Sequence, residues 1–215
     1  MHSTEKLKAG YQVFREKHFE SDKERYLDLC LNGQAPKTLL IACSDSRVEP
    51  SIILQTPPGE LFTIRNVGNL VPPYEGHDEH HYHGVSSALE YGVKVLQVEN
   101  IMIMGHAHCG AIQAAIDSES DPKSLGTEFL HHWVEIAQQT FQKPHCCAES
   151  IIEGNRYPHE IEQASIVNSM DNLMTFPFIQ EAVNKGNLKV FGLYFQIETG
   201  ELTAFNRKTG EFGAL

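Results

Sequence analysis

Two short apolar runs, each followed at once by a cluster of polar side chains, constrain the fold of this 215-residue chain most strongly. Residues 38–42 read Thr-Leu-Leu-Ile-Ala, and residues 101–105 read Ile-Met-Ile-Met-Gly. Runs of this length, bounded by turn-forming residues, are typical of buried strands. In an open α/β sheet, ligands and reacting groups collect beyond the carboxyl ends of parallel strands. We therefore expect the segments that follow the two runs to meet at one edge of a sheet.

Strand-like and helix-like patterns alternate along the chain. This alternation predicts an α/β fold with a mainly parallel central sheet of about four to five strands, flanked by helices. At 41% hydrophobic content the chain can bury one substantial core, so we expect a single domain over residues 1–215, with residues 1–34 as an N-terminal helical arm. The expected strands are 38–42, 59–65, 100–105, 189–196 and 202–205, and the expected helices are 4–14, 22–31, 85–95, 110–116, a turn-broken stretch 123–141, 160–173 and 178–184.

The two polar clusters contain a candidate zinc site. Cys43 follows the first apolar run, and His106 and Cys109 follow the second. Zn²⁺ favours thiolate and imidazole in tetrahedral geometry, and three protein ligands with one open position are typical of catalytic sites. If a helix begins near Gly105, His106 and Cys109 lie one turn apart and can both point at one ion. His108 alternates with His106 and could exchange roles with it.

An Asp and an Arg stand close to the first candidate ligand. Asp45 could fill the fourth position on the metal or orient whatever does, and Arg47 can hold its carboxylate through paired hydrogen bonds. Taken singly, a Cys at a strand end is usually a small buried hydrophobe, and an Asp before a helix is usually an N-cap. The combination of both clusters at two strand ends favours the metal site.

The ordered set of motifs resembles the β-class carbonic anhydrases. The similarity runs from about residue 10 to the end and is weakest over residues 117–158. The motifs that carry it are Cys-Ser-Asp-Ser-Arg at 43–47, Arg-Asn-Val-Gly-Asn-Leu-Val-Pro-Pro at 65–73, His-Gly at 83–84 with Ala-Leu-Glu-Tyr at 88–91, Gly-His-Ala-His-Cys-Gly-Ala at 105–111, and the segments 172–178 and 192–200.

The resemblance implies zinc-dependent, reversible hydration of carbon dioxide to bicarbonate and a proton by zinc-bound hydroxide. It also implies a homodimer or a dimer of dimers, because the family draws part of its apolar substrate wall from a neighbouring subunit, which the arm would wrap. The matching residues are Cys43, His106 and Cys109 as ligands of one Zn²⁺ per chain, Asp45 and Arg47 as the catalytic pair, and Gln34, Phe62, Val67, Tyr91 and the Gly110 amide at the substrate.

The resemblance also assigns the chain to one subgroup of the family. Gln34 is typical of members whose zinc site is open. In the other subgroup the counterpart of Asp45 coordinates zinc, stabilised by a bicarbonate near a Trp, an Arg and a Tyr. Here Leu40 replaces the Trp, although Arg65 is present. We therefore expect an open site.

Two other functions remain open from the sequence. The first is hydrolysis of carbon disulfide or carbonyl sulfide on the same site, which the motifs do not distinguish from carbon dioxide hydration. The second is a non-enzymatic zinc-binding or redox-responsive protein, for which Cys146 and Cys147 are the suggestive residues. Asp45, Arg47 and Gln34 argue against the second function, because zinc storage needs none of them.

Charge and composition exclude several classes of partner. Seventeen Lys and Arg against 28 Asp and Glu give a formal net charge of −11, which disfavours nucleic acid and anionic membranes. The apolar runs are too short to span a bilayer, so we expect no membrane insertion. The first residues lack an apolar signal core, and we expect a cytoplasmic location. Five cysteines, an odd number, predict thiols rather than disulfides. Cys30 is expected in the core. The histidines at 77, 80 and 81 are expected in solvent, with weak metal binding at most, and His83 is expected to pack near the site.

Overall fold

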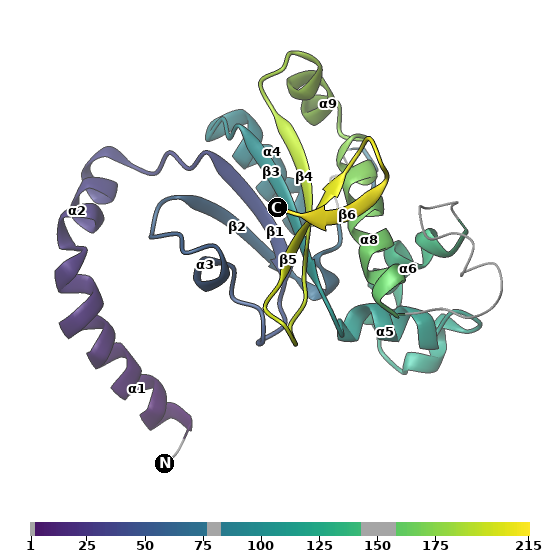
Figure 1. Cartoon of the computed structure of the whole chain (residues 1–215), viewed down its shortest axis with the longest axis horizontal. Helices are drawn as coiled ribbons and strands as arrows, with labels where there is room; N and C mark the ends of the chain where they lie inside the picture. The colour runs from purple at the N-terminus through teal and green to yellow at the C-terminus, as the bar shows by residue number, and fades with distance from the viewer. Residues whose placement is uncertain (1–2, 77–82, 143–157) are drawn as a thin grey trace.

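The chain forms a six-stranded, mainly parallel sheet with helices packed against it (Figure 1). This computed structural model describes residues 3–76, 83–142 and 158–215, so the expectations for the three histidines and for Cys146 and Cys147 lie outside the described residues. The strand order is β2-β1-β3-β4-β5-β6, with the first four parallel and the last two antiparallel. The strands are β1 (Thr38–Cys43), β2 (Leu61–Asn66), β3 (Asn100–His106), β4 (Lys189–Phe195), β5 (Leu202–Asn206) and β6 (Glu211–Ala214).

The predicted α/β class is confirmed, and so is the mainly parallel sheet. The expected count of four to five strands is low by one, because β6 is only four residues long and lacks a strong strand pattern. The helices are α1 (Ser3–Val13), α2 (Lys23–Asn32), α3 (Pro50–Ile53), α4 (Gly84–Glu90), α5 (Gly110–Asp117), α6 (Leu130–Gln138), α8 (Pro158–Leu173) and α9 (Pro177–Asn184), with π-helical turns at Phe14–Phe19 and Tyr91–Val95. The short α3 was not expected.

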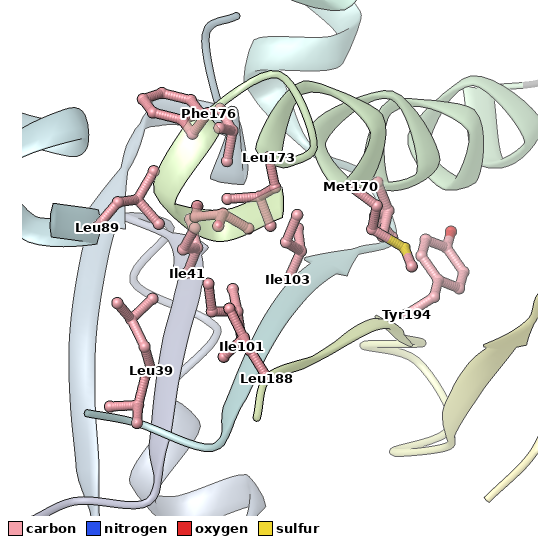
Figure 2. Close-up of a cluster of buried hydrophobic side chains, with 14 of the residues drawn as sticks. Leu39, Ile41, Leu89, Ile101, Ile103, Met170, Leu173, Phe176, Leu188 and Tyr194 are labelled. Atoms are coloured by element: carbon pink, nitrogen blue, oxygen red, sulfur yellow. The ribbon is translucent and has the colours of Figure 1, made fainter. Parts of the chain in front are cut away.

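Both faces of the sheet are covered, which explains the continuous apolar run of β1. Leu39 and Ile41 point to one face, where they pack with residues of α4, α8 and α9 (Figure 2). Leu40 and Ala42 point to the other face, towards α3 and β5. Successive strand residues face opposite sides, so a strand buried on both faces has no polar alternation.

The N-terminal helices extend away from the body of the chain (Figure 1). Neither α1 nor α2 contains a buried residue, and Leu7, Tyr11 and Leu31 are among their exposed large side chains. Cys30 is also exposed, so its expected place in the core is wrong for the single chain. No helix of the described ranges has the length and apolarity needed to cross a membrane.

Candidate metal centre

Three buried ligand atoms converge where β1 and β3 end. The ligand atoms of Cys43, His106 and Cys109 all lie within 4.8 Å of one another, and the two sulfur atoms are 4.0 Å apart. A tetrahedral ion with Zn–S bonds of about 2.3 Å places two thiolates about 3.8 Å apart. The spacing therefore fits Zn²⁺, and the predicted ligand set is brought together.

The expected helical spacing of His106 and Cys109 is wrong, although both residues reach the site. His106 is the last residue of β3, and Cys109 is the N-cap of α5, which begins at Gly110. Between them His108 has a φ of 56°, a left-handed conformation that reverses the chain locally. Its Nε2 atom contacts the Glu198 carboxylate, so His108 does not take the place of His106.

The His106 ring is held in the tautomer that a metal requires. Its Nδ1 atom lies 2.8 Å from the Ala107 carbonyl oxygen, which can only accept, so Nδ1 carries the proton. The lone pair is then on Nε2, which is buried and has no hydrogen-bond partner among the described residues. A ligating imidazole commonly uses its second nitrogen in this way.

The surroundings of Cys43, but not those of Cys109, favour deprotonation of the thiol. The Cys109 thiol donates to Cys43, and this bond, which outweighs the opposing effect of burial, lowers the pKa of Cys43 to about 4. The same bond and burial raise the pKa of Cys109. The Gly68 amide donates a further bond of 3.3 Å to Cys43 Sγ. Zinc takes both sulfurs as thiolates, so its binding releases the protons that the pair still holds.

Asp45 and Arg47 form the predicted pair beside the ligands. Arg47 donates Nε to Asp45 Oδ1 at 3.0 Å and Nη2 to Oδ2 at 2.7 Å, and its backbone amide donates to Oδ1 at 2.9 Å. These bonds hold the pKa of Asp45 well below its usual range, against the effect of burial. Asp45 Oδ2 lies 3.9 Å from His106 Nε2, so an ionised carboxylate stands next to the metal position.

Glu162 and Tyr194 support the centre from behind and were missed by the sequence analysis. Glu162 Oε1 accepts from the Cys109 amide at 2.9 Å, and Oε2 accepts from the Tyr194 hydroxyl at 2.6 Å. Burial raises the pKa of Glu162. Helix α8 lies close to the sheet because Gly105 leaves room for Ile166, whose Cδ1 atom would be 2.6 Å from a Cβ there. A carboxylate among the apolar residues of α8 is the signal that could have pointed to this role.

The residues expected at the substrate divide into two groups. Val67 follows β2 directly, and Gly110 follows Cys109, so both lie at the metal edge of the sheet. Phe62 lies four residues before the end of β2, about 13 Å from that edge. Its ring packs against Tyr91 in a tilted arrangement, with ring centroids 5.7 Å apart. Gln34 lies before the first residue of β1, at the opposite end of the strand from Cys43.

The fold and this centre define a class of protein: an α/β metalloprotein with a three-ligand zinc centre at the carboxyl ends of parallel strands. The family model described as carbonic anhydrase matches residues 38–202. Beta carbonic anhydrase 5, chloroplastic, of Arabidopsis thaliana is 38% identical over 189 residues, which are 88% of this chain and 60% of the relative. The chain belongs to the β-carbonic anhydrase family.

Solved structures agree with this assignment. The structure of the β-carbonic anhydrase CcaA superposes with a TM-score of 0.85 at 31% sequence identity. The match covers 99% of this chain and 92% of the CcaA chain. A tetrameric β-carbonic anhydrase from Sordaria macrospora has a TM-score of 0.69 and 27% identity, with 99% and 96% covered. The fold is therefore shared over nearly the whole chain. The chain spans less than two thirds of the chloroplastic relative.

Proposed function

We propose that this protein catalyses the reversible hydration of carbon dioxide to bicarbonate and a proton. The observation that carries the proposal is the ionised Asp45, held by Arg47 within 3.9 Å of the unpartnered His106 nitrogen. A protein that only stores zinc needs the three ligands but no oriented carboxylate next to them. The arrangement is that of a centre built for a reaction at the fourth position of the metal.

Each residue of the pair has a defined task in this reaction. Zinc, when bound, supplies the nucleophile by lowering the pKa of a water molecule to near 7. With zinc in place, Asp45 would accept a hydrogen bond from that nucleophile and orient it towards the substrate carbon. Arg47 keeps Asp45 ionised and fixes its plane with two side-chain bonds. The Gly110 amide, the first of α5, donates towards the negative charge that develops on the substrate.

We propose further that the metal site is of the open type. Both oxygens of Asp45 are engaged by Arg47, which holds the carboxylate away from a ligand position. Leu40 is fully buried and leaves no aromatic ring for an inhibitory bicarbonate. The Arg65 guanidinium donates to the backbone carbonyls of Cys43, Asp45 and Val48. It also donates to the Glu49 carboxylate.

We also propose a homodimer as the smallest active unit, with dimers of dimers as larger forms. Phe62, Tyr91 and Gln34 stand away from the metal of their own chain, so a neighbouring subunit is the means by which they reach a site. The edge strand β2 is only half-buried, and Tyr91 is 44% exposed. The exposed arm α1–α2 offers apolar side chains for the same interface.

The proposed location is cytoplasmic. Thiolate ligands and an unpaired Cys30 favour a reducing compartment. One relative is named chloroplastic, so fractionation of cells that express the native gene decides between the cytoplasm and an organelle.

A stopped-flow assay of carbon dioxide hydration tests the proposed reaction. The zinc-loaded protein is compared with the chelated protein and with Asp45→Asn, beside an assay of sulfide release from carbon disulfide and carbonyl sulfide. Zinc-dependent hydration that Asp45→Asn largely abolishes supports the proposal. Sulfide release without hydration, or no turnover of any of the three substrates, contradicts it.

A further inference from the structure

One peptide group joins the only tryptophan of the chain to a zinc ligand. The Trp133 Nε1–H group on α6 donates to the Val67 carbonyl oxygen at 2.6 Å. The N–H of the same peptide, that of Gly68, donates to Cys43 Sγ at 3.3 Å. The peptide plane between Val67 and Gly68 is thus bonded at both ends.

The loop around this peptide has little freedom to aim the amide in another way. Gly68 has a φ of 81°, and a Cβ at this position would lie 2.9 Å from the Ala111 Cβ. Asn66 bridges the loop, since its side chain donates to the Leu70 carbonyl and accepts from the Leu70 amide, each at 2.9 Å. The peptide plane between Val67 and Gly68 can still rotate, and the bond from Trp133 to the Val67 carbonyl limits this rotation.

We propose that Trp133 is a positioning residue for the zinc centre, which aims the Gly68 amide at the Cys43 thiolate. Hydrogen bonds in a chain polarise one another, so a donor on the carbonyl strengthens the N–H as a donor to sulfur. A stronger bond to the thiolate stabilises the negative charge on sulfur, and with it the form that binds a metal, and it fixes the sulfur in place. Bonds of this kind to metal ligands affect both affinity and activity.

The same contact forms part of the wall of a cavity. Trp133 and Val67 line a cavity of about 940 Å³ together with Ser44, which follows the ligand Cys43. The indole also packs against the apolar cluster that contains Cys43 and Cys109. The hydrogen bond from the indole N–H therefore fixes both the position of Val67 in the cavity wall and the Gly68 bond to the Cys43 sulfur. The proposal rests on the proposed function only in the identity of the metal.

The test separates the N–H bond from the packing of the ring. Trp133→Phe keeps an aromatic ring without a donor, and β-(3-benzothienyl)alanine at position 133 keeps the bicyclic shape with sulfur in place of N–H. Val134→Ala, a truncation of the adjacent and fully buried residue of α6, is the packing control. Zinc affinity is measured by competition with a chelator, and the Co²⁺-loaded protein is examined for its sulfur-to-cobalt charge-transfer band.

Both replacements of Trp133 are expected to weaken zinc binding about tenfold and to move the charge-transfer band to longer wavelength. The longer wavelength follows because a thiolate that loses a hydrogen bond donates its electrons more easily. Val134→Ala is expected to lower stability while affinity and band stay as in wild type. Unchanged affinity and band in the benzothienyl variant, or the same changes in Val134→Ala, would overturn the proposal. Neither zinc affinity nor the charge-transfer band depends on carbon dioxide hydration. Failure of the proposed reaction is therefore distinguishable from failure of the proposed role of Trp133.

Discussion

Two inactive variants are expected to restore activity to each other when they share a dimer. Asp45→Asn damages the carboxylate beside the metal, and Gln34→Ala removes the amide expected at the substrate. From Thr38 to Cys43, β1 rises about 16 Å, at 3.3 Å a residue. The Lys37 carbonyl accepts from the amides of Glu99 and Asn100 at 2.9 and 3.0 Å, which keeps the chain just after Gln34 at the far end of the sheet.

A Gln side chain extends only a few ångströms, so Gln34 cannot reach the metal of its own chain. If Gln34 instead serves the neighbouring subunit, a dimer with one variant of each kind has one doubly damaged site and one intact site. Such a dimer should recover about half of the wild-type activity per dimer, because a two-fold dimer has two equivalent sites.

The assay uses the two variants co-expressed with different affinity tags and purified over both tags in turn. Carbon dioxide hydration is measured by stopped flow, with each variant alone as the control and zinc content checked for all three preparations. Mixed dimers that are no more active than their parents, at full zinc occupancy, would refute the assignment of Gln34 to the partner's site.

Four further outcomes are expected. Cys109→Ser should lose both zinc, measured by elemental analysis, and hydration activity, because one of three ligands is gone; full occupancy with activity would contradict the ligand set. Asp45→Asn should keep zinc and lose about 10- to 100-fold in turnover, since an amide neither pairs with Arg47 as an anion nor accepts as strongly; near-normal turnover would leave Asp45 with a structural role only. Tyr194→Phe should lower the free energy of unfolding in urea by about 1–3 kcal/mol, because a Glu162 oxygen stays buried without its donor, while the exposed Tyr74→Phe serves as control. A crystal structure of the zinc-loaded protein near pH 8 should show Asp45 bonded to Arg47, and inhibition by bicarbonate should be non-cooperative; a Zn–O distance of about 2.0–2.2 Å to Asp45 would contradict the open site.

The N-terminal arm and the residues expected at the substrate have roles that one chain by itself does not explain. The sequence predicts helices near both ends of the arm, and these are present as α1 and α2. It cannot say what the exposed apolar side chains of these helices contact. Phe62 and Tyr91 match the family's substrate wall, yet in one chain they pack against each other at the edge strand β2. In the proposed dimer their role depends on a second copy of the chain, which no local pattern encodes.

The ligands of the metal are determined by the sequence itself. Cys43 and His106 end or directly follow apolar runs that are typical of buried strands, and the carboxyl ends of neighbouring parallel strands lie at one edge of the sheet. The side-chain chemistry of two thiols and an imidazole then selects zinc. This part follows from local patterns because strand burial and ligand type are both properties of short segments.

Only the tertiary structure decided how the centre is held. The left-handed turn at His108, rather than a helix, brings Cys109 to His106. Glu162 reaches the Cys109 amide from 53 positions away, and Trp133 reaches the Val67 carbonyl from 66 positions away. Periodicity reports which face of a segment is buried but not which segment covers it. Contacts between residues so far apart in the sequence depend on how closely α6 and α8 pack against the rest of the fold. Small residues that allow close packing, such as Gly105 beneath α8, form no recognisable sequence pattern.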